Sequence, residues 1–340
     1  MLSTKLLKQV ALNAGADIVA VGPTSRYEGC PTQMDIRYAL PGCKSIIALG
    51  FKHFRGVFRG IEEGTFFTNY SSMGYASINS IRQPLTLKAI CDWIEDQGYD
   101  TMPIPNHLGW TPNDLSGQVI GKEKIPRENF SKPAKEGYPH PNVAHHMRLG
   151  AVIAGLGEIG WSKMFLSKEY GPRQRIALLL TDAEFEYDPV VKPGTICDRC
   201  KLCVKNCTGN AIPFDDNDCI TVTIDGHEIK WANIDYMKCS RYFCGASPKH
   251  NPFNITEEDR VNFAEHVGKA QEYKLRTIYW YARALEGASG CIRACMRHLE
   301  ETGRITSRFE SKFRRKPAWK LKDDTETELP NQDKEIENWE

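Results

Sequence analysis

Residues Cys197-Asp-Arg-Cys200-Lys-Leu-Cys203-Val-Lys-Asn-Cys207 place the strongest constraint on this 340-residue chain. The four cysteines follow a C-x2-C-x2-C-x3-C spacing within eleven residues. Three thiolates spaced in this way can reach three corners of a cubic iron–sulfur cluster from one tight loop, whose amides then point at the sulfur atoms. The fourth cysteine lies beyond that loop, so we expect it to bind a second cluster.

The same spacing is typical of bacterial ferredoxins and argues against zinc. Structural zinc usually takes two close pairs of ligands separated by a longer loop, and four cysteines in eleven residues do not provide this arrangement. Two [4Fe-4S] clusters require eight thiolates. The chain has twelve cysteines, nine of which fall between Cys197 and Cys295. The sequence therefore contains enough thiolates for both clusters in one region.

The ligands of each cluster follow from the ferredoxin pattern, in which the last cysteine of the second motif completes the first cluster. For the first cluster we expect Cys197, Cys200, Cys203 and Cys295. For the second we expect Cys207, Cys239, Cys291 and one further residue. We favour Cys244 over Cys219 for that place, because Cys219 follows the acidic stretch 215–218, which disfavours an anionic cluster nearby.

Composition excludes several classes of protein. Hydrophobic residues make up 41% and charged residues 26%, which is typical of globular chains rather than disordered ones. Lys and Arg (44) nearly balance Asp and Glu (43), so the chain is not a globally basic nucleic-acid binder. The longest apolar stretch, around residues 151–157, is shorter than the ~20 residues that a bilayer span needs. Residues 1–10 lack a signal-like apolar run, so we expect a cytoplasmic protein.

Periodicity in the first half predicts helices that alternate with buried strands, and hence a layered α/β core up to about residue 185. We expect helices at 3–14, 78–97 (with Pro84 near its start) and 148–156, and strands at 17–22, 45–51, 99–103 and 175–182. Residues 105–145 show no periodicity and are rich in Pro, Gly, Asn and His, which favours a binding loop or a lid. The tail is basic over 304–322 and acidic over 323–340, a pattern more typical of a solvated segment than of a partner site.

Five segments in a fixed order carry a resemblance to a known family. They are 40–47 (LPGCKSII), 97–106 (QGYDTMPIPN), 154–160 (AGLGEIG), 170–173 (YGPR) and 178–182 (LLLTD), followed by the cysteine run. Together they closely resemble the cobalamin-dependent reductive dehalogenase and epoxyqueuosine reductase superfamily. The similarity covers roughly residues 1–300.

This resemblance implies the fold class α/β (α+β). A nitroreductase-like domain over 1–190 would hold base-off cobalamin and the substrate, and a ferredoxin-like domain with two [4Fe-4S] clusters would span 191–303, before the charged tail at 304–340. The residues implied in cobalamin binding are Gly155, Gly157, Gly160, Tyr170, Arg173 and His145. For the glycines, close approach to the corrin and packing of helix on sheet remain alternatives.

Reductive cleavage also needs a proton donor, a task suited to Tyr, His or Lys. By position in the dehalogenase-like pattern we expect Tyr75, Asn106 and His140 to line the catalytic site, with Tyr70 as the alternative to Tyr75. The chain departs from the epoxyqueuosine reductase pattern at residues 138–146, where the usual acidic proton donor is absent.

These expectations describe an iron–sulfur, cobalamin-dependent reductase that acts on a small organic substrate and takes electrons from a low-potential donor such as ferredoxin or flavodoxin. Two alternatives remain. One is an epoxyqueuosine reductase acting on tRNA, which the basic segment favours and the missing acid opposes. The other is an electron-transfer partner that activates a separate corrinoid protein.

Overall fold

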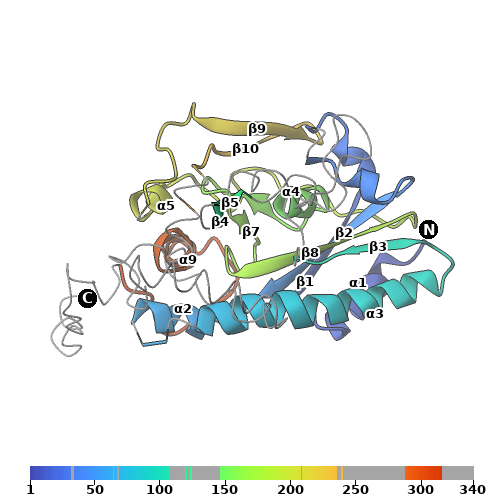
Figure 1. The fold of residues 1–340 in the computed structure, drawn as a ribbon, viewed down its shortest axis with the longest axis horizontal. Coiled ribbons are helices and arrows are strands. Elements are labelled where there is room, and N and C mark those ends of the chain that lie inside the picture. The colour runs from blue at the N-terminus through green and yellow to red at the C-terminus, as the bar shows by residue number, and fades with distance from the viewer. Residues whose placement is uncertain are drawn as a thin grey trace.

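A four-stranded sheet forms the centre of the molecule (Figure 1). The computed structural model describes residues 1–31, 34–63, 65–66, 69–106, 119–120, 123–124, 146–207, 209–235, 239 and 288–315. The sheet order is β1 (Ile18–Pro23), β2 (Ser45–Lys52), β8 (Gln174–Thr181) and β3 (Thr101–Ile104), and all neighbouring pairs are antiparallel. The alternation of helix and strand thus belongs to an α+β arrangement rather than to a parallel sheet.

Helices α1 (Thr4–Asn13) and α3 (Gln83–Glu95) cover one face of this sheet (Figure 1). Apolar residues of both helices pack on alternate residues of the strands, such as Ile47, Leu49 and Leu179. Ser3 caps α1 by accepting a hydrogen bond from the amide of Leu6, as the sequence suggests for a helix that starts there. Every second strand residue therefore belongs to a core shared with these two helices.

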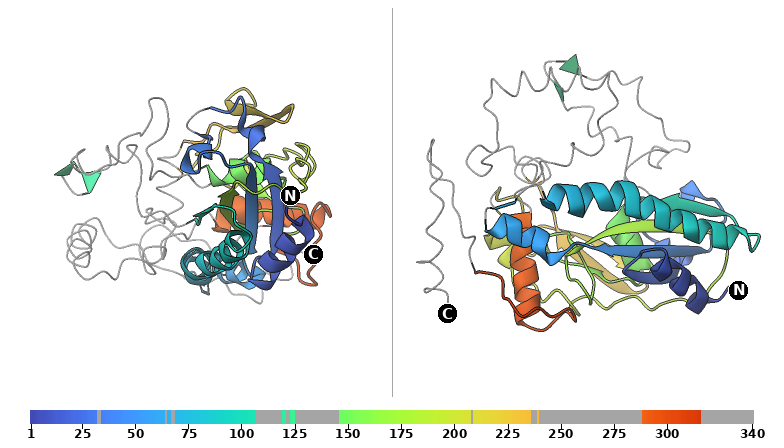
Figure 2. Two further views of the ribbon diagram at one scale, coloured as in Figure 1. Left: turned by 90° about the vertical axis from the view of Figure 1, so that its right-hand side faces the viewer. Right: turned by 90° about the horizontal axis from the view of Figure 1, so that it is seen from below.

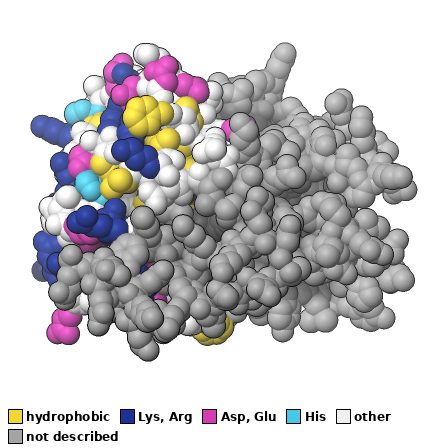
Figure 3. Space-filling view, turned by 90° about the vertical axis from the view of Figure 1, so that its left-hand side faces the viewer, with side chains coloured by type: hydrophobic (Ala, Val, Ile, Leu, Met, Phe, Trp, Pro, Cys, Tyr) yellow, Lys and Arg dark blue, Asp and Glu magenta, His cyan; other side chains and the backbone are white. Residues whose placement is uncertain are grey.

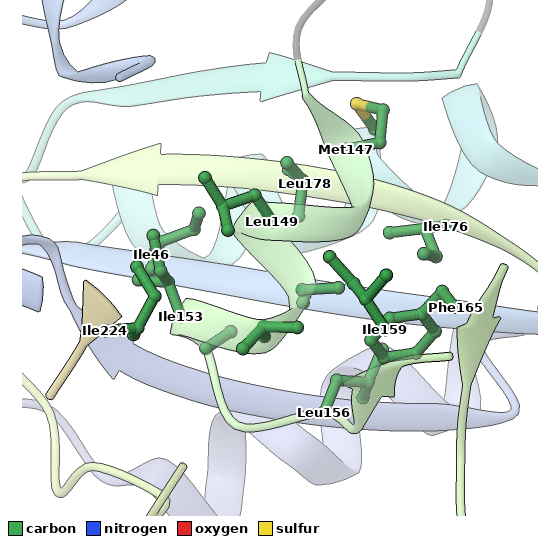
Figure 4. Packing of buried hydrophobic residues seen from close by; sticks show 14 of the residues in the cluster. Ile46, Met147, Leu149, Ile153, Leu156, Ile159, Phe165, Ile176, Leu178 and Ile224 are labelled. Atoms are coloured by element: carbon green, nitrogen blue, oxygen red, sulfur yellow. The ribbon is translucent and has the colours of Figure 1, made fainter. Parts of the chain in front are cut away.

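The opposite face carries α4 (Met147–Ile153) and, above it, the hairpin of β9 (Cys219–Ile224) and β10 (His227–Ala232) (Figure 1). Figure 4 shows Leu149 and Ile153 of α4 between the strand residues Ile46 and Leu178 and the hairpin residue Ile224. The hairpin lies within residues 191–303, the range of the expected ferredoxin-like domain. Its apolar residues nevertheless share a core with the sheet and α4.

At one end of the sheet, α2 (Arg55–Glu62) lies beside α9 (Arg293–Glu301) in both directions of view (Figures 1 and 2). The buried Glu62 carboxylate accepts hydrogen bonds from Arg293, 2.8 Å to Nη2, and from the backbone amide of Arg314. Arg55 pairs with Glu300 at 2.9 Å. This charged network attaches α9 and residues 303–315 to the first half of the chain. Burial makes such paired charges costly to separate.

The described part also contains five further short elements. These are β6 (Glu158–Ile159), β7 (Phe165–Leu166), α5 (Leu202–Lys205) and a small pair of strands, β4 (Val119–Ile120) with β5 (Glu123–Lys124). Strands β6 and β7 pair with each other and lead from α4 toward the cysteine loop.

The expected helix at 78–97 differs at its start. Two π-helical turns, Tyr70–Ala76 and Ile78–Arg82, run directly into α3, and Pro84 occupies the second position of that helix. The missing amide of a proline is tolerated in a first turn, and the wider turns before it allow the chain to remain helical. Within the described ranges, no helix has the length and apolarity that a bilayer span requires.

Candidate metal centre and active site

Four cysteines meet at one small cavity between α5 and α9. Cys197 and Cys200 precede α5 and Cys203 lies within it, whereas Cys295 comes from α9, almost one hundred residues later. Arg199 and Lys201 adopt left-handed backbone conformations (φ 56° and 59°), which turn the loop around the cavity. The structure therefore brings together the four residues expected to bind the first cluster, and their role as ligands stays a prediction.

The electrostatics of this cavity suit a positively charged metal centre. Burial, followed by the charges of the neighbouring Cys197 and Cys200, raises the pKa of Cys203 to about 11. Burial also raises the pKa of Cys295 far above its ordinary value, with Cys197 as the next largest cause. Thiols that repel one another as thiolates hold a proton unless cations bind between them. The residues present thus fit a group that supplies several iron ions.

A second group contains Cys207, Cys239 and Cys291. Burial raises the pKa of Cys291 strongly, and the charges of Cys207 and Cys239 are the next causes. Cys244, our expected fourth ligand, lies outside the described residues. Cys219 packs against the same apolar cluster as Cys207 and Cys291, and its Sγ lies 3.8 Å from Thr221 Oγ1. The choice between Cys219 and Cys244 remains open.

Trp161 connects the two cysteine groups. Its buried ring packs in one apolar cluster with cysteines of both groups, among them Cys203 and Cys291, and its Nε1 donates to Pro213 O at 2.9 Å. The Lys201 Nζ lies 3.2 Å from the centre of the ring. A cation at this distance interacts favourably with the ring face. The tryptophan and the lysine therefore both line the cavity at which the first cysteine group meets.

The glycines of the AGLGEIG segment have contacts that explain them by packing. A Cβ on Gly155 would lie 2.5 Å from Pro189 O, and one on Gly157 would lie 2.1 Å from Leu166 O. A Cβ on Gly160 would lie 3.5 Å from Cys197 Sγ. Backbone of this chain thus fills the space beside Gly155 and Gly157, which favours the packing alternative for these two. Their role in cobalamin binding is still a prediction.

Tyr170 and Arg173 lie beside the end of β2. The Arg173 guanidinium is buried, donates to His53 O and lies 3.4 Å from Ser307 Oγ. Within the described part of the chain, its Nε has no hydrogen-bond partner. The Tyr170 ring lies 5.5 Å from the Arg173 guanidinium and 5.9 Å from Lys52 Nζ. These contacts join the sheet to the segment that follows α9.

Tyr75 stands in an aromatic cluster with Tyr70 and His53. Its ring centre lies 5.4 Å from that of Tyr70 and 6.4 Å from that of His53. The Arg175 guanidinium lies 4.0 Å from the centre of the Tyr75 ring, and Arg175 Nε donates to Asn79 Oδ1 at 3.1 Å. Tyr75, our expected proton donor, therefore faces a fixed cation.

This aromatic cluster also touches the second cysteine group. Tyr70, Tyr75 and Cys291 belong to one apolar cluster at the junction of α2 and α9. Burial raises the pKa of Tyr70 well above its ordinary value, and Tyr75 raises it further. A candidate proton donor and a candidate cluster ligand thus lie in one compact region, which is the arrangement that proton-coupled reduction needs.

Three further residues were expected at the site: Asn106, His140 and His145. The backbone amide of Asn106 donates to Gln83 Oε1 at 2.7 Å, which places this residue just after β3 and beside α3. His140 and His145 lie outside the described residues. The neighbouring His146 accepts a hydrogen bond from the Leu149 amide at its Nδ1 (3.1 Å), so it caps α4.

Two residues of this region, Arg175 and His53, escaped the sequence analysis. The alternation of side chains along a strand could have found Arg175. Arg175, Ala177 and Leu179 are every second residue of β8, so they lie on the same face of the sheet, the one that α3 covers. His53 is buried, and no described residue forms a hydrogen bond with its Nδ1. Burial and then the charges of Arg175 and Arg173 lower its pKa well below the ordinary value. No pattern in the sequence marks it.

Sequence comparison finds a partial similarity to one kind of enzyme. No protein-family model matches the chain. The tetrachloroethene reductive dehalogenase of Desulfitobacterium hafniense is 31% identical over 126 residues, which make up 34% of this chain and 22% of that protein. The match thus spans about a fifth of the relative's length. Over about a third of the chain, it confirms the resemblance to the reductive dehalogenase superfamily that the motifs indicated.

Solved structures of reductive dehalogenases and of epoxyqueuosine reductases are also similar to this chain. One is a reductive dehalogenase whose structure suggests a mechanism for B12-dependent dehalogenation, with a TM-score of 0.46 and 20% identity over 83% of this chain and 36% of that chain. Another is the epoxyqueuosine reductase of Streptococcus thermophilus, with a TM-score of 0.40 and 13% identity over 86% of this chain and 81% of that chain.

Proposed function

We propose that this protein is a cobalamin-dependent iron–sulfur reductase that removes a halogen from a small organic substrate. The observation that carries the proposal is the meeting of Cys197, Cys200, Cys203 and Cys295 at one cavity. The C-x2-C-x2-C-x3-C spacing of Cys197–Cys207 is typical of iron–sulfur ligation and unlike the separated pairs of a zinc site. Two [4Fe-4S] clusters use both groups.

Cobalamin is the second cofactor that we propose. When bound, it supplies a strongly reducing cobalt centre, so that the protein needs only to position the substrate and to supply electrons and a proton. Support comes from the similarity to dehalogenases and from two buried polar atoms near the aromatic cluster, His53 Nδ1 and Arg173 Nε, which have no hydrogen-bond partner among the described residues. Orphaned buried polar atoms are costly in a finished structure, so they are expected where a group is still to bind.

The chemistry assigned to the protein side chains is proton supply. Replacement of a halogen by hydrogen takes two electrons and one proton and releases a halide ion. The Tyr75 hydroxyl would donate the proton to the substrate carbon, and Arg175, 4.0 Å from the ring, would stabilise the phenolate that remains. A later proton from solvent would restore the phenol.

Electrons would come from a low-potential donor such as a ferredoxin or flavodoxin. Figure 3 shows the end of the molecule that is on the left in Figure 1, where α2, α5 and α9 lie; basic side chains gather along one edge of the described surface, with acidic and apolar ones beside them. We also propose a location in the cytoplasm, because a reducing compartment keeps the cysteines proposed as cluster ligands from forming disulfides.

The alternative of a tRNA substrate gains little from Arg304 and Arg314, two cations of the basic segment 304–322. Arg304 lies 3.4 Å from Asp198 and Arg314 lies 2.9 Å from Glu63, so these cations are used within the molecule. Phosphate binding would require them to be free. We therefore retain the small organic substrate.

Anaerobic purification with added cobalamin tests the proposal. We expect about eight irons and one cobalt per chain, and release of chloride from tetrachloroethene or a chlorinated phenol with a reduced viologen as donor. Eight irons without cobalt would indicate an electron-transfer partner instead. Zinc, or only four irons, would contradict the proposal.

A further inference from the structure

Glu158, in the AGLGEIG segment, accepts three hydrogen bonds from the backbone of the cysteine loop. Its side chain is buried on β6. Oε2 accepts from the Gly194 amide at 2.8 Å, whereas Oε1 accepts from the Ile196 amide at 2.8 Å and also from the Cys197 amide. A carboxylate in this position holds the loop that presents Cys197 to the metal cavity.

The carboxylate has no cationic partner among the described side chains. On the other side of the loop, Arg304 Nη1 lies 3.3 Å from the carbonyl oxygens of Gly194 and Thr195. The loop at 194–196 is thus held from two sides. Its Gly194 and Ile196 amides donate to Glu158, and its carbonyl oxygens accept from Arg304. A carboxylate can only accept hydrogen bonds, so the three backbone N–H donors around Glu158 match its charged form.

Two consequences follow for a metal cluster bound at Cys197. The Cys197 amide is committed to Glu158, so it is not available to donate to a cluster sulfur. In addition, the buried Glu158 carboxylate contacts the backbone amide of Cys197 itself. Water screens a negative charge poorly in such a buried place. Hydrogen bonds to sulfur and net charge are two of the factors that set the potential of such clusters. Both effects disfavour addition of an electron.

We propose that Glu158 is a positioning residue that lowers the reduction potential of the cluster held by Cys197, Cys200, Cys203 and Cys295. The inference rests on the iron–sulfur part of the proposed function and not on cobalamin or the substrate. It predicts that the cluster at the cavity next to Glu158 has a lower potential than it would have without this carboxylate.

The test compares the full chain, reconstituted anaerobically with iron and sulfide, with the variants Glu158→Gln and Glu158→Asp. EPR-monitored redox titration would give the potential of each cluster separately. For Glu158→Gln we expect one cluster to become at least tenfold easier to reduce, about 59 mV for a one-electron couple, while the other stays unchanged. Glu158→Asp retains the charge and should stay close to the wild-type potential.

A matched control is Asp216→Asn, which also removes one negative charge near α5. The Asp216 side chain is 63% exposed and pairs with Lys201, so water screens its charge and no shift is expected. Equal shifts in Glu158→Gln and Asp216→Asn would overturn the inference, because they would reflect net charge alone.

The remaining outcomes also decide the question. Eight irons in Glu158→Gln with both potentials unchanged would overturn the inference. If Glu158→Gln retained only four irons, Glu158→Asp would decide: eight irons at wild-type potentials would support charge-dependent tuning, and a raised potential would contradict it. A wild-type chain without iron would overturn both the inference and the proposed function. A tuned pair of clusters without cobalamin binding would leave the inference standing while the proposed function fails.

Discussion

The guanidinium of Arg175 lies over the ring of Tyr75, 4.0 Å from its centre. The hydrogen bond from Arg175 Nε to Asn79 holds the guanidinium in place. Strand β8 supplies the arginine and the first π-helical turn supplies the tyrosine, so the pair joins the sheet to the helical layer. A phenol beside a fixed cation is well suited to donate a proton, because the cation stabilises the anion that forms.

The first prediction concerns the hydroxyl of Tyr75. In Tyr75→Phe we expect the turnover of a chlorinated substrate to fall by about 100- to 10,000-fold, which is the usual contribution of a positioned acid. Iron and cobalt contents should stay as in the wild type. Tyr187→Phe is the control, since this tyrosine is 38% exposed and lies apart from the aromatic cluster. Unchanged turnover in Tyr75→Phe would remove Tyr75 from the mechanism.

The second prediction concerns the charge of Arg175. Arg175→Met retains much of the length of the side chain but loses the cation, and we expect a loss of about 100- to 1,000-fold in kcat. Arg175→Lys should recover part of the activity, because the ammonium keeps the charge but loses planar stacking and the fork of donors. Equal losses in both variants would show that packing rather than charge is responsible. Single-turnover kinetics would separate this effect from substrate binding.

The third prediction decides the fourth ligand of the second cluster. We expect Cys244→Ser to retain about four irons and Cys219→Ser to retain about eight, measured on anaerobically reconstituted protein. The reason is charge: Asp218 and its neighbours make the surroundings of Cys219 unfavourable for an anionic cluster. The reverse pattern of iron contents would move the ligand role to Cys219, which packs near Cys207 and Cys291.

The positions of sheet and helices could be predicted because burial leaves a periodic pattern. The expected strand at 45–51 corresponds to β2, and the expected helix at 3–14 to α1. The direction of the strands could not be predicted, since a buried antiparallel strand and a parallel one have the same apolar composition. The π-helical turns before α3 also lack a pattern of their own.

The candidate site was predictable in its cysteines but not in its polar residues. Fixed spacing marks Cys197, Cys200 and Cys203, and the convergence of Cys295 follows the ferredoxin pattern. Arg175, by contrast, reaches Tyr75 across one hundred residues of sequence through strand pairing and helix packing. Spacing along the chain carries no information about such a contact, which only the folded structure shows.

The fourth prediction tests whether the AGLGEIG glycines serve packing. A Cβ at residue 157 would lie 2.1 Å from Leu166 O, a backbone atom that cannot move aside without shifting β7. We expect Gly157→Ala to lower the free energy of unfolding by about 1–3 kcal/mol or more. The control is Gly56→Ala, in α2, where a Cβ meets nothing within 4 Å. Here we expect the free energy of unfolding to rise by about 0.5–1 kcal/mol. A stable Gly157→Ala that binds cobalamin weakly would instead support the cofactor role.

The fifth prediction concerns acid stability and His146. Burial, followed by the charges of Lys163 and Arg148, lowers the pKa of His146 from 6.5 to about 3. The unfolded chain therefore takes up a proton at a higher pH than the folded one. The resulting stability is fully present above pH 6.5 and is lost progressively between pH 6.5 and about pH 3, by about 2 kcal/mol at pH 5.

His146→Asn isolates this effect, because an asparagine side chain can still accept the hydrogen bond of the Leu149 amide that caps α4. Urea unfolding of the chain at pH 7 and pH 5, with and without the substitution, gives the comparison. We expect the wild type to lose about 2 kcal/mol more than His146→Asn over this interval. Equal losses in the two proteins would mean that other groups carry the acid sensitivity, and that the histidine tolerates its charge within the fold.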